Sequence, residues 1–114
     1  MNESILATIK KLLGLERDYT AFDEDVIVHI NSIIWKIRQL GCGIDDFQIT
    51  GYDETWSDYL GEDYPRMPIV KTFIYMNVRL LFDPPTNASL YSQYTETIKE
   101  MESRIIYECD PRYE

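Results

Sequence analysis

The stretch that decides the fold is MPIVKTFIYMNVRLLF, residues 67–82. Its apolar side chains cover much more than half of a helix circumference, and only Thr72 and Arg79 mark a narrow polar side. A helix that is apolar nearly all round is buried, so this stretch is expected to be the central helix. Pro68 is tolerated in the first turn, and the sequence Asp83-Pro84-Pro85 ends the helix.

A second helix is predicted on the N-terminal side, at Asp23–Leu40. Asp23 is a good N-cap, and the acids that follow it lie where the helix dipole favours negative charge. One face of this helix is apolar and is expected to be buried: it carries Val26, Ile30, Ile33, Ile37 and Leu40.

A third long helix is predicted on the C-terminal side, at Asn87–Glu108, with Asn87 as its cap. Glu100 and Arg104 form a favourable pair on its outer side. Its apolar stripe consists of Leu90, Tyr91, Tyr94, Ile98, Met101 and Ile105.

The first helix is predicted at Glu3–Leu13, with Asn2 or Ser4 as its cap and Gly14 at a left-handed exit. Lys10 and Lys11 are expected to face away from its apolar stripe, which consists of Ile5, Leu6, Ile9, Leu12 and Leu13.

The segment 42–66 is rich in both acids and aromatic residues, with seven acids against one base, Arg66. Asp53 is expected to cap one or two helical turns at 53–60, and a short strand or hairpin at 47–52 stays open. A segment this long is usually functional when it connects two elements. The chain as a whole is therefore expected to be a single all-α domain, 1–114, a compact bundle of four main helices with one long acidic-aromatic loop.

No motif for catalysis or for a cofactor is found. His29 is the only histidine, and it has no partner at metal-ligand spacing. The acids fit no calcium loop, and neither a phosphate loop nor a nucleophile motif occurs. Cys42 and Cys109 are expected to be free thiols, although a disulfide stays open. We expect no enzymatic activity, no cofactor and no metal.

The formal net charge of −9 argues against binding to nucleic acid or to an anionic membrane surface. An acidic protein can instead line a path for DNA without holding it. No apolar run is long enough to span a membrane. Ile5–Leu15 is interrupted by two lysines and lacks a cleavage site, so no signal peptide is expected.

Surplus apolar side chains point to a protein interface. Val28 and Trp35 lie roughly opposite the apolar face of their helix, and other candidates lie in the acidic loop and near the C-terminus. Tyrosine and tryptophan are favoured at interfaces. The candidate interface residues are Val28, Trp35, Trp56, Tyr59, Tyr64 and Tyr107.

An ordered set of motifs resembles a known family. The set consists of ILATIKKLLGL (5–15), YTAFDED (19–25) before HINS (29–32), GCG (41–43), TWSDYL (55–60), and VKTFIYM (70–76) before LLFDPP (80–85). Over residues 4–106 the chain resembles the small head–tail connector (adaptor) proteins of phages and prophages of Gram-positive bacteria.

The resemblance implies an α-helical, non-catalytic structural protein that forms a ring of about twelve subunits beneath the portal. Its implied partners are other copies of itself, the portal protein and tail-side connector proteins. Whether the copies form the ring on their own or only on the portal stays open. DNA passes through without being specifically bound. The implied location is the virion, and the host bacterial cytoplasm during assembly.

One alternative rests on charge alone. An acidic protein can mimic DNA and inhibit a host nucleic-acid enzyme. A mimic should space its acids along exposed faces like phosphates, whereas seven of the twenty acids here fall within one aromatic-rich loop.

Overall fold

The computed structural model describes residues 3–41, 46–61 and 67–109, without the side chains of residues 67, 108 and 109. The described residues form an all-helical globule without strands, as the sequence predicted. Its five helices are α1 (Ile5–Leu12), α2 (Asp23–Gln39), α3 (Trp56–Leu60), α4 (Met67–Phe82) and α5 (Ala88–Cys109).

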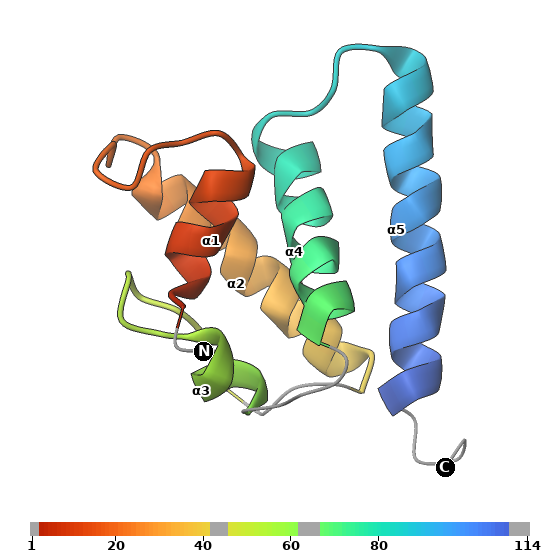
Figure 1. The fold of residues 1–114 in the computed structure, drawn as a ribbon. Coiled ribbons are helices and arrows are strands. Elements are labelled where there is room, and N and C mark those ends of the chain that lie inside the picture. Colours follow the sequence, from red (N-terminus) through yellow and green to blue (C-terminus); the bar gives the residue numbers. More distant parts are fainter. Residues whose placement is uncertain (1–2, 42–45, 62–66, 110–114) are drawn as a thin grey trace.

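Helix α4 is the central element, as its apolar sequence predicted. It contacts α1, α2 and α5. Figure 1 shows α2 crossing behind α4, α5 along one side of α4, and α1 on the side away from α5. The molecule measures 43 × 36 × 21 Å, so its thinnest dimension is about two helix diameters.

The core joins residues from all five helices and one loop residue, Ile49. The predicted apolar face of α2 is buried except for Leu40, which follows the helix and is partly buried. The inner residues of α4 are buried too, and so are Ile98 and Ile105 of the α5 stripe. The buried apolar residues are Ile5, Leu6, Ile9, Val26, Ile30, Ile33, Ile34, Ile37, Ile49, Trp56, Tyr59, Val70, Phe73, Ile74, Val78, Ile98 and Ile105.

The N-terminal end of α1 is held by its own cap and by the segment before α3. The Ser4 hydroxyl accepts a hydrogen bond from the Ala7 N–H, which makes Ser4 the cap. An isolated bridge pairs Ser4 with Thr55. Through it, Ile5 N–H donates to the Glu54 carbonyl at 3.1 Å. Gly14 leaves the helix with a φ of 83°, as predicted.

Lys10 is buried, so the prediction that it faces away is wrong, and only Lys11 of the two lysines is exposed. Leu12, placed in the apolar stripe by the sequence, is also exposed. The Lys10 ammonium donates to the carbonyls of Arg17 and Tyr19, at 3.0 and 2.7 Å, and to the Tyr52 hydroxyl at 2.7 Å. Together with Asp23, described below, these acceptors surround the buried ammonium. They lie far from Lys10 in sequence, which is why helical spacing on α1 did not reveal them.

Asp23 does not cap α2, contrary to the prediction. The N-cap is Phe22, which makes no side-chain capping bond. Instead Asp23 Oδ1 lies 2.7 Å from the Lys10 ammonium and balances its charge, and the Tyr52 hydroxyl lies 3.3 Å from Oδ2. The Asp23 carboxylate, predicted to cap α2, therefore forms an ion pair with the buried Lys10 ammonium instead.

The segment 42–66 contains no strand in its described part, 46–61. The backbone of Ile49 pairs with a side chain instead of another strand. Its N–H donates to Asn31 Oδ1 at 2.8 Å, and its carbonyl accepts from Asn31 Nδ2 at 3.0 Å. The helical turn begins later than predicted. Its cap is Thr55, in a capping box with Asp58, rather than Asp53.

Helix α5 runs past α4 and is tied to it near its N-terminal end. Asn87 caps it as predicted, because its Oδ1 accepts from the Leu90 N–H at 3.1 Å. Arg79 of α4 donates to the hydroxyls of Tyr94 and Tyr75, at 3.0 and 3.3 Å.

Candidate interaction surface

The side of α2 opposite its buried face forms a stripe that we call the α2 outer face. Its members are exposed and recur every three or four residues: Asp25, Val28, Ser32, Trp35 and Gln39. This spacing places them in one row along the helix. Val28 is 61% exposed and Trp35 is 60% exposed, so both stand in solvent as the sequence predicted.

The α2 outer face lies in an acid-free part of an acidic chain. Residues 26–44 contain no Asp or Glu, although the chain has 20. The two bases of the helix are Lys36 and Arg38. Lys36 is engaged, since it lies 3.5 Å from Glu102 of α5. Beyond Asp25 this face therefore offers apolar contact without negative charge.

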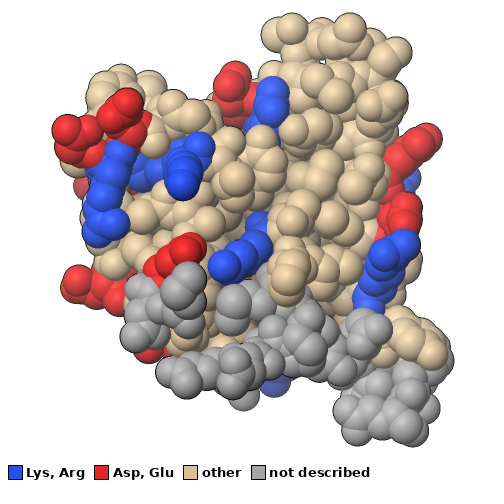
Figure 2. Space-filling model, viewed as in Figure 1, with Lys and Arg blue, Asp and Glu red and all other residues tan. Residues whose placement is uncertain are grey.

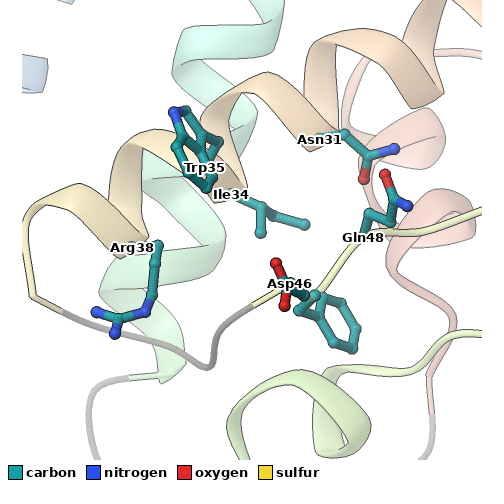
Figure 3. Close-up of a pocket in the computed structure, with 7 residues that line it drawn as sticks. Asn31, Ile34, Trp35, Arg38, Asp46 and Gln48 are labelled. Carbon is teal, nitrogen blue, oxygen red and sulfur yellow. The ribbon is translucent and has the colours of Figure 1, made fainter.

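A hollow of about 200 Å³ opens beside Trp35. Its α2 side is lined by Asn31, Ile34, Trp35 and Arg38, and its other side by residues 46–48. Figure 3 shows Trp35 standing up from the helix at one edge, with Asp46 near Ile34 and with Asn31 facing Gln48. The hollow contains one acid and one base, Asp46 and Arg38.

The wall of the hollow opposite α2 is positioned by local chemistry. The double hydrogen bond between Asn31 and Ile49 fixes residue 49 against α2. Asp46 has a φ of 61°, a left-handed conformation that aspartate tolerates better than most residues. The Phe47 ring stacks on the buried Tyr59 ring, with centroids 4.8 Å apart. The hollow is therefore built from ordered parts of the fold.

The structure moves two predicted interface residues into the core. Trp56 is fully buried and Tyr59 is 2% exposed, so the expectation that they are exposed is wrong. Trp56 Nε1 donates to Thr8 Oγ1 at 3.0 Å, and the Lys71 ammonium lies 5.2 Å from its ring centroid. The bridge between Ser4 and Thr55 holds α3 against the start of α1, and both rings are buried in the core.

The remaining predicted residues do not join the α2 outer face. Tyr107 is 58% exposed, but it belongs to α5. Tyr64 lies outside the described residues, and so do the side chains of Cys42 and Cys109.

Sequence reasoning missed a second exposed surface, at the end where α4 and α5 meet. Leu81 is 54% exposed, Leu90 39% and Tyr91 43%. The α5 stripe had placed Leu90 and Tyr91 among residues facing the core. A signal was present, because residues 84–95 are the longest stretch of the chain without a charged residue.

The displaced pKa values belong to contacts that hold the fold together. Burial opposes the charge of Lys10, but its contacts with Asp23 and Tyr52 outweigh burial and raise its pKa. Hydrogen bonding to Tyr75 raises the pKa of Arg79, and burial raises that of Tyr94. Burial likewise opposes the charge of Glu54, but hydrogen bonds from Thr50 prevail and lower its pKa. None of these four groups lies on the α2 outer face.

Two further observations concern the described residues only. No three of their His, Cys, Asp and Glu side chains are grouped so that they could hold a metal ion. None of the helices in the described ranges combines the length and the hydropathy that crossing a membrane requires.

Comparison with known proteins gives one match. The model of a family described as "Phage connector protein" matches residues 5–112, which is nearly the whole chain. Members of this family are structural and not enzymatic. No curated protein and no solved structure matches the chain.

Proposed function

We propose, since the chain belongs to the phage connector protein family, that it is a head–tail connector subunit of a tailed phage or prophage of a Gram-positive bacterium. In this proposal the whole chain acts as one connector domain. Copies form a ring beneath the portal, and DNA passes through the ring. The protein meets the portal and tail-side connector proteins, first in the host cytoplasm during assembly and then in the virion.

The observation that carries the proposal is that this chain, a member of the connector family, exposes apolar side chains along the α2 outer face. A subunit on its own leaves two apolar side chains, Val28 and Trp35, largely in water on the same side of one helix. Aromatic side chains of this kind often anchor protein interfaces. A subunit that completes its surface only in an assembly explains their exposure.

The net charge supports the passage of DNA. A charge of −9 on each subunit, repeated around a ring, repels the phosphate backbone rather than holding it. A DNA mimic, the alternative that charge suggested, finds no support in a family of structural connectors.

The test is incorporation into particles. Phage particles are assembled with the wild-type chain, with Trp35→Asp, or with Thr97→Asp, which introduces the same charge at an exposed position of α5. The proposal predicts that the Trp35→Asp chain folds but is lost from purified particles, whereas Thr97→Asp is retained. Particles that mature normally with no copy of the wild-type chain would contradict a connector function.

A further inference from the structure

The second exposed surface projects from the rest of the molecule. We define the tip as Leu81 together with residues 84–95, which comprise most of the α4–α5 loop and the first two turns of α5. Figure 1 shows this end of α5 rising above the other helices, and in Figure 2 the projecting surface is tan, without blue or red. The tip therefore projects and has no charged residue between 84 and 95, although the exposed Asp83 adjoins it, and it exposes Leu81, Leu90 and Tyr91.

The tip and the α2 outer face are far apart in one subunit. The Lys36–Glu102 contact places the C-terminal half of α2 beside the C-terminal half of α5. Tyr91 precedes Glu102 by 11 residues on the same helix, which is roughly 16 Å along its axis. The two surfaces therefore cannot cover each other within the subunit.

Charge limits where two copies of this chain can meet. Each copy has a net charge of −9, so most of their surfaces repel each other. The tip has no charged residue between 84 and 95, and the α2 outer face has no acid beyond Asp25. Acids adjoin them, such as Asp83, two residues after Leu81, and Asp46 in the lining of the hollow, but a contact of Leu90 and Tyr91 with Trp35 sets no acid directly against another.

Their shapes are also complementary. The hollow of about 200 Å³ lies beside the α2 outer face, shares Trp35 with it, and has the buried Ile34 and the acidic Asp46 in its lining. The tip presents Leu90 and Tyr91, single large side chains on a rigid helix. Hot-spot side chains commonly fill pockets of this kind at the centre of an interface.

We propose that the tip of one copy docks on the α2 outer face of a second copy, with Leu90 and Tyr91 against Trp35 and its hollow. The contact uses different surfaces on the two copies, so it is heterologous and can continue from copy to copy until a ring closes. The proposal rests on the proposed connector function, because it names the partner of the same surface.

The proposed contact is tested with two variants, each of which lacks one side of it. Tyr91→Asp damages the tip and leaves the α2 outer face intact, whereas Trp35→Asp does the reverse. Sedimentation of the purified full-length chain at high concentration is expected to show self-association for wild type and monomers for either variant alone. Each variant should weaken the contact by roughly 30-fold or more, as for a hot-spot loss. A mixture should form one-to-one dimers and nothing larger, because one intact contact remains.

Thr97→Asp is the matched control, since it adds the same charge to α5 outside the tip and should still self-associate. Circular dichroism establishes that all variants are folded. A mixture that stays monomeric overturns the proposal, and so does a single variant that associates like wild type.

The outcome is separable from that of the connector function. If the mixture forms no dimer, but Trp35→Asp is still lost from phage particles, the chain remains a connector and the docking of tip on α2 outer face is wrong. If the mixture of the two variants forms no dimer and each variant also binds purified portal protein less tightly than wild type under conditions where wild type is monomeric, the two surfaces contact the portal, which also overturns the proposal.

Discussion

At the scale of single residues, side chains of the same type have opposite roles in this chain. Trp35 stands in solvent on α2, whereas Trp56 is enclosed in the core under a hydrogen bond to Thr8. Helical spacing placed Trp35 correctly because α2 is long and regular. It could not place Trp56, whose burial depends on the bridge between Ser4 and Thr55, 51 residues apart in sequence.

The two tryptophans therefore predict different responses to the same substitution. Trp56→Ala should lower the free energy of unfolding by about 3–5 kcal/mol, because it empties a large buried site. Trp35→Ala should lower it by less than about 1 kcal/mol, since most of the ring is already in water. Urea denaturation measures both. A loss of several kcal/mol at Trp35 would make it a core residue and remove it from the interaction surface.

Lys10 predicts a second pair of unequal substitutions. Lys10→Met removes the cation from a buried site, so the Asp23 carboxylate loses its counter-charge and the Tyr19 carbonyl loses the ammonium as its donor. It should cost about 3 kcal/mol of unfolding free energy. Lys11→Met, at the exposed neighbour, should change stability by less than about 0.5 kcal/mol. Equal effects of the two substitutions, measured by thermal or urea unfolding, would argue against the buried network.

Glu54 predicts the response of the fold to acid. Its folded-state pKa lies below the ordinary value of 4.5 because Thr50 donates two hydrogen bonds to its carboxylate, at 3.1 and 2.8 Å. This contribution to stability is complete above pH 4.5 and is lost as the pH falls through the lowered pKa. Glu54→Gln should therefore unfold with a weaker pH dependence below pH 4.5 than wild type. An unchanged acid profile would contradict the role of these hydrogen bonds.

At the scale of elements, regular periodicity was enough to predict the four long helices. Helix α4 has the predicted bounds, and α2 ends one residue earlier than predicted. The wrong local predictions concern groups that bond to residues outside their own element. Lys10 takes Asp23 away from the start of α2, and Asn31 replaces a strand partner for Ile49. Leu90 and Tyr91 continue the α5 stripe, but that end of α5 projects beyond the body of the fold.

The shortest helix provides a prediction at this scale. Thr55 accepts the Asp58 N–H at 3.1 Å, and Asp58 Oδ2 accepts the Thr55 N–H at 3.0 Å. Thr55→Ala should cost about 1 kcal/mol, the usual value of an N-cap, and should speed amide exchange in α3. Thr86→Ala, in the exposed α4–α5 loop, is the control and should leave both unchanged. Slow exchange in α3 of the Thr55→Ala chain would show that the cap is dispensable.

At the scale of the whole molecule, the distribution of charge is the property that connects fold and function. The sequence showed an acidic chain with surplus aromatics, and the structure separates these features. In its described part, 46–61, the acidic-aromatic segment contributes Phe47, Trp56 and Tyr59 to the packing of the fold. The exposed apolar side chains of α2 and the tip instead lie in stretches without acids. That separation could not be read from composition, because it depends on which side of each helix faces water.

The most direct test of the central claim is a structure of the assembled connector by electron microscopy, in phage particles or on the purified portal. The account predicts copies of this chain in a ring around the DNA path, with Trp35 and Val28 of each copy buried against a neighbouring protein. A ring in which both side chains remain in solvent, or particles in which this chain occupies no position between head and tail, would contradict it.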